Sequence, residues 1–461
     1  MPGGAHAATR NRRAILAAAR DAVLTQTTGA TPARLAAFDI LRAVRKGELA
    51  DRALARVLPG VPPRERAFAQ ELTYGVLRMR GRLDYRISRI ATRPLGEIQP
   101  DALDALRMGA YQLFELNGIP PYAAVSESVE LVKPGGTAVA GFVNGVLKGM
   151  QRAGSPAFPS LDQDAVTHLT TWGSHPQWLV ERWIRQYGAE DTAWLVEANN
   201  RRPEVIIQPF SMTTTESVRV LSGEPEMTAE ALQFHAKGIR LTHGDVTRAL
   251  ELVPGIVQDP AARFVTRYIG AKPKDTVLDV CAAPGGKAVG LAQRAGYTVA
   301  ADLSLQRLGR VHENVERLRG QGVPINAGLV VADARTPPFR EADIVFVDAP
   351  CTGTGTLRRH PDGRWRLQHS DLRALVTLQR EILLAAAACV QPGGILVYAT
   401  CSLEPEENAQ QVEWLLQNIE GFAVAPPSDF PLRLDRRGFL HVLPQEHGFD
   451  GAFAARLRRI R

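Results

Sequence analysis

The stretch "DTVLDVCAAPGGKA", Asp275–Ala288, decides the fold of this chain. Its apolar residues up to Val280 predict a strand, two glycines then predict a tight turn, and the apolar segment from Ala288 predicts a helix. A strand that runs through a glycine turn into a helix is the opening unit of a parallel α/β domain.

The sequence after Ala288 continues the alternation of strands and helices. Apolar runs predict strands at 296–302, 328–333, 342–350, 393–401 and 451–459. Helical patterns lie between them at 304–320, 371–390 and 404–418. Near-continuous apolar strands are typical of a sheet that is buried on both faces. We therefore predict a doubly wound, Rossmann-like α/β domain over residues 256–461.

Composition places the chain among large globular proteins. A chain of 461 residues is longer than one hydrophobic core usually organises, so we expect several domains. The apolar content of 45% and charged content of 22% are those of a soluble protein. The net charge of +7 is compatible with a polyanionic partner. We expect no membrane span and no secretory signal, because no apolar run is long enough and the N-terminus lacks an apolar core segment. The four cysteines form no CxxC pair, so we expect no metal site and a cytoplasmic location.

The part before residue 256 divides into three predicted regions. Residues 1–32 are predicted to form a flexible basic extension. Residues 33–154 have apolar residues at helix spacing and are predicted to form a helical bundle. Residues 155–255 mix helical and strand patterns and predict a small α+β connector. Within that connector, "MTAEALQFHAKG" (227–238) predicts a helix and "GIRLTHGDV" (238–246) a strand.

Acidic residues recur where the predicted strands of the C-terminal domain end. They are Asp279, Asp302, Asp333 and Asp348. Ligands of doubly wound sheets bind at this edge, and an acid after the second strand typically accepts the hydroxyls of a ribose. The turn is neither GxGxxG nor a P-loop, which argues against NAD and ATP and favours S-adenosylmethionine. The predicted cofactor-binding residues are Cys281, Ala282, Ala283, Pro284, Gly285, Gly286, Lys287, Asp302, Asp333 and Asp348.

Two cysteines also lie at predicted strand ends. Cys351 follows "DAP" and Cys401 follows "YAT", on strands that are neighbours in a methyltransferase-type sheet, so both thiols could face one pocket. Taken alone, Cys401 could equally be a small buried core residue. The basic stretch "LRRHPDGRWR" (357–366) follows Cys351, and its Arg358, Arg359 and Trp365 could contact RNA, although a solvated charged loop has the same composition.

Three motifs carry a resemblance to a known family. "LDVCAAPGGKA", "DAPCTGTGTLRRHPD" and "YATCSLEPEEN" resemble the signature motifs of RNA (cytosine-5)-methyltransferases. "ELTYGVLR" and "VSESVELVKPGGTAVAGFVNGVLKG" resemble the RNA-binding NusB fold. From about residue 33 to 461 the order is similar to the family of bacterial 16S ribosomal RNA methyltransferase B. Ala452 departs from that family's usual aromatic residue after Asp-Gly.

The resemblance implies an enzyme that transfers a methyl group from S-adenosylmethionine to C5 of a cytosine in 16S rRNA. A monomer is the default expectation, because the sequence does not settle the oligomeric state. It implies Cys401 as the nucleophile, Cys351 as its assistant and Asp348 as the acid near the base; DNA cytosine methyltransferases would instead select Cys351. The alternative functions are those of a methyltransferase for tRNA or another RNA, of a catalytically silent RNA-binding factor, and of a dithiol redox protein.

Overall fold

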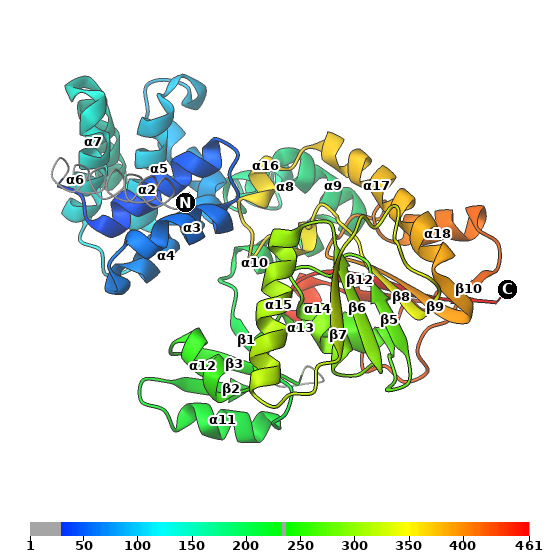
Figure 1. Cartoon of the computed structure of the whole chain (residues 1–461). Coiled ribbons are helices and arrows are strands. Elements are labelled where there is room, and N and C mark those ends of the chain that lie inside the picture. Colours follow the sequence, from blue (N-terminus) through cyan, green and yellow to red (C-terminus); the bar gives the residue numbers. More distant parts are fainter. Residues whose placement is uncertain (1–28, 233–236, 461) are drawn as a thin grey trace, which may run out of the picture. The chain divides into compact units, whose positions relative to one another are not determined.

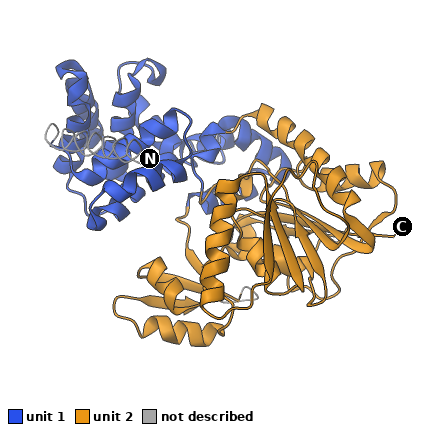
Figure 2. Ribbon diagram, in the orientation of Figure 1, with its two compact units in different colours: residues 1–200, 360–366 blue, residues 201–359, 367–461 orange. Residues whose placement is uncertain are grey.

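The structure, a computed structural model, describes residues 29–232 and 237–460 (Figure 1). The chain forms two compact units, residues 1–200 with 360–366 and residues 201–359 with 367–461 (Figure 2). The predicted N-terminal extension lies outside the described residues up to position 28. Among the described residues, no helix combines the length and apolar character that crossing a membrane requires.

The first unit is helical. It contains the predicted helical bundle of 33–154 and also the helices between 165 and 200, which were predicted to belong to the α+β connector. Its helices are α2 (Pro32–Arg45), α3 (Ala50–Val57), α4 (Pro63–Ser88), α5 (Pro100–Phe114), α6 (Pro121–Val132), α7 (Thr137–Ala153), α8 (Ala165–Thr171), α9 (Gln177–Tyr187), α10 (Ala189–Asn200) and α16 (Gly363–Arg366). Four of them begin with a proline, which fits the first helical position because that residue needs no amide donor. Leu72, Leu106 and Leu147 are fully buried in the core that α2 and α4–α7 share.

The second unit opens with a small antiparallel sheet in the order β2-β3-β1-β4. Its strands are β1 (Val205–Pro209), β2 (Thr228–Ala231), β3 (Ile239–His243) and β4 (Gly255–Val257), and its helices are α11 (Thr214–Ser222) and α12 (Val246–Leu252). The prediction of a helix over 227–238 was wrong, because Thr228–Ala231 is a strand. Pairing with β3 and burial of Met227 and Ala229 outweigh the helix propensity of this segment.

The large sheet has the order β10-β12-β9-β8-β5-β6-β7, and β11 also pairs with β12. Its strands are β5 (Thr276–Asp279), β6 (Tyr297–Asp302), β7 (Ala327–Val331), β8 (Ala342–Asp348), β9 (Val390–Thr400), β10 (Phe422–Val424), β11 (Leu440–Val442) and β12 (Ala452–Arg459). The strands from β9 to β7 are parallel, and β12 is antiparallel to β9. This is the predicted doubly wound α/β domain.

Helices cover both faces of the large sheet (Figure 1). The helices are α13 (Pro260–Ile269), α14 (Gly286–Ala292), α15 (Leu305–Gly320), α17 (His369–Ala388), α18 (Ala409–Asn418) and α19 (Pro444–His447). Phe346 of β8 packs in one core with α13, whereas its neighbour Val345 packs in another core with α17 and α18. Successive residues of a strand point to opposite faces, so two buried layers explain the continuous apolar runs.

Candidate active site

Cys351 and Cys401 lie together where two parallel strands end. β8 and β9 are neighbours in the sheet, with Asp348 beside Ala399. Each cysteine follows its strand within three residues, so both arrive at the same edge of the sheet. The two Sγ atoms are 3.4 Å apart. The structure therefore brings the two predicted catalytic thiols into direct contact.

The third predicted catalytic residue, Asp348, is bound to the lysine of the glycine turn. Lys287 Nζ donates to Asp348 Oδ2 at 2.7 Å, from the first turn of α14 to the end of β8. Burial lowers the pKa of Lys287, but the carboxylate of Asp348 outweighs that effect and the net pKa is raised. Lys287 is therefore a positive charge held at the catalytic edge of the sheet.

The surroundings make the two thiols unequal. The hydrogen bond from Cys351 lowers the pKa of Cys401 against the opposing effect of burial, and the charge of Lys287 lowers it further. The pKa of Cys351 is raised well above its usual range, first by the hydrogen bond to Cys401 and then by burial. The hydrogen bond from Cys351 and the positive charge of Lys287 both stabilise a thiolate on Cys401. Because the thiolate is the nucleophilic form, this asymmetry favours Cys401 as the attacking residue.

A buried carboxylate, Glu407, holds the segment after Cys351. Its Oε1 accepts hydrogen bonds from Thr352 N at 2.9 Å and from Gln379 Nε2 at 3.0 Å, and its Oε2 accepts one from the Thr352 hydroxyl. Gln379 also donates to Pro350 O at 2.9 Å. Burial raises the pKa of Glu407, and these hydrogen bonds oppose that rise. The bonds fix the backbone on both sides of Cys351.

A second buried network holds the segment after Cys401. Asn408 Nδ2 donates to Ser402 O at 2.9 Å, and the Thr400 hydroxyl donates to Asn408 Oδ1 at 2.5 Å. Sequence reasoning gave Glu407 and Asn408 no role. The available signal was a pair of polar residues directly before an apolar helix, within the "PEEN" of the third motif.

The glycine turn has the shape of a ligand cradle. Gly285 has φ +108°, and a Cβ there would lie 3.0 Å from Val311, so a side chain is excluded on both grounds. Asp279, fully buried at the end of β5, accepts a hydrogen bond from Cys281 N at 3.3 Å, while its Oδ2 is buried with no hydrogen-bond partner among the described residues. Burial, followed by the charge of Asp348, raises the pKa of Asp279 well above its usual range. An unpaired buried acceptor beside a glycine cradle fits a ligand that brings its own polar groups.

The acids that follow the next two strands of the sheet, Asp302 and Asp333, form different contacts. Asp302 is 4% exposed and accepts hydrogen bonds from Ala283 N at 3.2 Å and Ser304 N at 2.9 Å, which ties the end of β6 to the glycine turn. Asp333 lies two residues beyond β7 and forms an ion pair with Arg335 at 2.7 Å. The structure thus links Asp302 directly to the cradle through the backbone of Ala283. It gives no such link for Asp333, whose assignment to the cofactor stays a prediction.

The predicted RNA-binding residues are engaged within the protein. Arg358 and Arg359 both form ion pairs with Asp259 and Asp450, at distances between 2.6 and 3.3 Å. In the helical unit, Trp365 Nε1 donates to Leu77 O at 2.6 Å. These contacts give the stretch 357–366 a structural role, and a contact of the three residues with RNA stays a prediction.

The pKa values of the other two thiols, Cys281 and Cys389, shift in the opposite direction to that of Cys401. Burial raises the pKa of Cys281, and the charge of Asp279 raises it further. Burial also raises the pKa of Cys389, which ends α17. Neither thiol is activated as Cys401 is.

Five parallel strands with a glycine cradle after the first, and two thiols in contact at the same edge, are the fold and site expected of an S-adenosylmethionine-dependent methyltransferase. Residues 267–458 match the family described as 16S rRNA methyltransferase RsmB/F, residues 31–152 match the NusB family, and residues 175–247 match the ferredoxin-like domain of RsmF/B-like methyltransferases. The chain belongs to the RsmB/F family of RNA (cytosine-5)-methyltransferases.

Similar proteins span nearly the whole chain. The probable ribosomal RNA small subunit methyltransferase B of Synechocystis sp. is 35% identical over 93% of this chain and 99% of its own length. The ribosomal RNA small subunit methyltransferase B of Erwinia tasmaniensis is 33% identical over 92% and 97%. Among solved structures, PH0851 shares the fold with a TM-score of 0.76 at 24% identity, covering 94% of this chain and 99% of that one.

Proposed function

We propose that the protein transfers a methyl group from S-adenosylmethionine to C5 of a specific cytosine in 16S rRNA, through a covalent bond between Cys401 Sγ and C6 of the base. The observation that carries the mechanism is the contact of the two thiols together with the lowered pKa of Cys401. The names of the Synechocystis and Erwinia relatives support the small-subunit rRNA substrate.

The residues present fit S-adenosylmethionine. The glycine cradle admits a close backbone approach, Asp279 offers an unpaired carboxyl oxygen, and Asp302 is a carboxylate at the end of the second strand. We infer that the cradle, Asp279 and Asp302 hold the cofactor, with Lys287 at the inner end of the turn. When bound, S-adenosylmethionine supplies an electrophilic methyl group on a sulfonium, which leaves as a neutral thioether.

Cytosine C5 needs activation before it can accept a methyl group. The Cys401 thiolate adds to C6, and the electron pair of the C5–C6 double bond becomes available at C5. The addition places negative charge on the ring, and a proton donated from the Lys287–Asp348 pair stabilises it, because a carboxylate alone would repel it. After C5 is methylated, its proton leaves with the assistance of Cys351. The C6–S electron pair then returns to sulfur and restores the Cys401 thiolate.

Trapping the covalent intermediate tests this assignment. RNA that contains 5-fluorocytosine has no C5 proton to lose, so the wild-type protein should retain a covalent adduct detectable by mass spectrometry. Cys351→Ala should still form the adduct and Cys401→Ala should not, while Cys389→Ala serves as a matched thiol control. Adduct formation by Cys401→Ala but not by Cys351→Ala would reverse the roles.

Transfer from labelled S-adenosylmethionine identifies the substrate. Label in cytosine of 16S rRNA supports the proposal, whereas label only in tRNA or another RNA would reassign the substrate. No transfer to any RNA would favour the silent RNA-binding factor. Bisulfite sequencing of rRNA from a deletion strain then locates the modified cytosine.

A further inference from the structure

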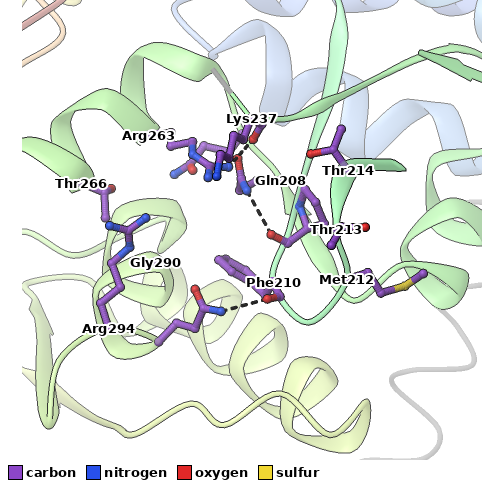
Figure 3. A pocket seen from close by; sticks show the side chains of 13 residues that line it. Gln208, Phe210, Met212, Thr213, Thr214, Lys237, Arg263, Thr266, Gly290 and Arg294 are labelled. Carbon is purple, nitrogen blue, oxygen red and sulfur yellow. Dashed lines mark hydrogen bonds between the residues drawn. The ribbon is translucent and has the colours of Figure 1, made fainter. Parts of the chain in front are cut away.

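A cleft of about 390 Å³ lies in the second unit, where the small sheet meets the helices that precede and follow β5. Its walls come from the end of β1, the start of α11, α13 and the C-terminal half of α14 (Figure 3). The volume falls within the range of ligand-binding pockets, roughly 300–1,000 Å³. None of the residues that the active site uses lines this cleft.

The cleft is cationic. Lys237, Arg263 and Arg294 line it, and no acidic residue does (Figure 3). Within residues 29–232 and 237–460, none of these three side chains forms an ion pair with a carboxylate. Burial lowers the pKa of Arg263 to about 10, and the positive charges of Arg294 and Arg267 contribute to that shift. The uncompensated positive charge indicates an anionic ligand.

The acids next to the cleft in sequence are already committed elsewhere. Asp259, which follows Gln258, forms ion pairs with Arg358 and Arg359. Glu216 accepts hydrogen bonds from the Thr213 backbone at 2.9 Å and hydroxyl at 2.7 Å, in the capping box that starts α11. Its carboxylate therefore stabilises the start of α11 rather than pairing with the arginines. This contrasts with Arg358 and Arg359, whose charges are balanced by two aspartates.

The cleft also offers an unused donor. Gln258 Nε2 is buried and has no hydrogen-bond partner among the described residues. Gln293, by comparison, donates its amide to Phe210 O at 3.1 Å. Guanidinium groups with a free amide donor match the oxygens of a phosphate, for which arginine is the preferred partner.

One helix joins the cleft to the catalytic edge of the sheet. α14 begins at Gly286 in the glycine turn; Gly290 in its later part and Gln293, which caps its C-terminus, line the cleft. Seven residues of helix span about 10 Å. The cleft therefore lies about one short helix away from the glycine turn, which is a separation that a few nucleotides of RNA can span.

We propose that this cleft binds a phosphodiester group of the RNA substrate, with Arg263 and Arg294 as its main contacts and Lys237 and Gln258 as supporting donors. The inference rests on the proposed function, because it takes RNA as the substrate. It adds a backbone anchor that is separate from the pocket for the target base.

Binding of RNA to charge-neutral variants tests the anchor. We expect Arg263→Gln and Arg294→Gln each to weaken rRNA binding by on the order of tenfold. The slope of log K against log salt should fall by about 0.7 for each lost contact to single-stranded RNA. Arg433→Gln, an exposed arginine outside the cleft, is the matched control and should leave both quantities near the wild-type values.

Two results separate this proposal from the proposed function. If wild-type protein methylates rRNA but both cleft variants bind RNA like Arg433→Gln, the anchor is wrong and the enzyme assignment stands. Absence of methyl transfer by the wild type would instead remove the proposed function. Melting temperature and affinity for S-adenosylmethionine show whether each variant is folded.

A footprint on the unmodified protein keeps the test independent of folding defects. Bound rRNA should protect Lys237 from acetylation, measured by mass spectrometry, and should leave exposed Lys274 reactive. Protection of Lys237 by RNA supports the anchor. Protection by inorganic phosphate without protection by RNA would assign the cleft to a free anion and overturn the proposal, as would no protection by either.

Discussion

Replacing Glu407 by alanine should disable the segment that carries Cys351. The substitution removes the acceptor for Thr352 N–H, for the Thr352 hydroxyl and for one of the two bonds of the Gln379 amide. Gln379 keeps its bond to Pro350 O, and the Thr352 hydroxyl can rotate to another acceptor. The backbone N–H of Thr352 is therefore the main buried donor that is left without an acceptor. An orphaned buried donor costs about 1–3 kcal/mol, and the lost bonds bring the expected loss of stability to about 2–4 kcal/mol.

Glu407→Gln should largely preserve the site, because the amide oxygen can still accept from Thr352 N and Gln379 while its NH₂ group faces a hydroxyl that can accept. Thermal unfolding measures the difference in stability between the two variants, because each kcal/mol shifts the melting temperature by about 2–4 °C in a unit of this size. Single-turnover methyl transfer should fall by about 100-fold in Glu407→Ala, since a displacement near 1 Å has that effect.

The exposed pair of Glu413 with Arg437 provides the control, because surface ion pairs contribute under about 1 kcal/mol. Glu413→Ala should therefore leave both the melting temperature and the transfer rate almost unchanged. If Glu407→Ala melts and reacts like Glu413→Ala, Glu407 does not hold the segment around Cys351 and the reasoning fails.

Two further substitutions probe the charge and the packing of the site. In Lys287→Gln, Cys401 loses a positive charge that lowers its pKa, so the rising limb of the single-turnover rate against pH should move to higher pH; an unchanged limb would show that Lys287 does not stabilise the thiolate. In Gly451→Ala, the new Cβ would lie 2.7 Å from Gly355 Cα, so we expect a loss of about 1–3 kcal/mol in urea unfolding, whereas Gly309→Ala in open space on a helix should be neutral or stabilising. Equal stability of the two glycine variants would contradict the described packing.

The fold was predictable where one local pattern decides the element. The apolar runs that became β5, β6, β8 and β9 have no competing interpretation, because continuous β-branched and apolar residues bounded by glycine, proline or aspartate favour buried strands. The segment 227–238 was not predictable in this way. Alanine, leucine and glutamate favour a helix locally, and Thr228–Ala231 is extended because it pairs with the next strand, β3, a contact that local propensity does not report.

The site was predictable to the level of which residues lie at the strand ends. The contact of Cys351 with Cys401 follows from two adjacent parallel strands that end in register. The partners of the arginines could not be predicted, because Asp259 and Asp450 approach Arg358 and Arg359 from segments about 90–100 residues away. A basic stretch beside a catalytic cysteine is equally consistent with a bound phosphate and with a bound carboxylate, and only the tertiary structure distinguishes them.

The glycine turn and the two thiols are electrostatically coupled through Lys287, although they belong to separate segments of the chain. Lys287 belongs to the glycine turn that we propose holds the cofactor, yet its ammonium group binds Asp348 and lowers the pKa of Cys401. The pKa of Cys351 is instead raised, first by its hydrogen bond to Cys401, then by burial and by the charges of Cys401 and Glu407. The difference between two chemically identical thiols therefore originates in part from a residue whose position is set by the cofactor turn. A ligand that shifts this turn would alter the ionisation of Cys401, so cofactor binding and activation of the nucleophile are expected to be coupled through Lys287.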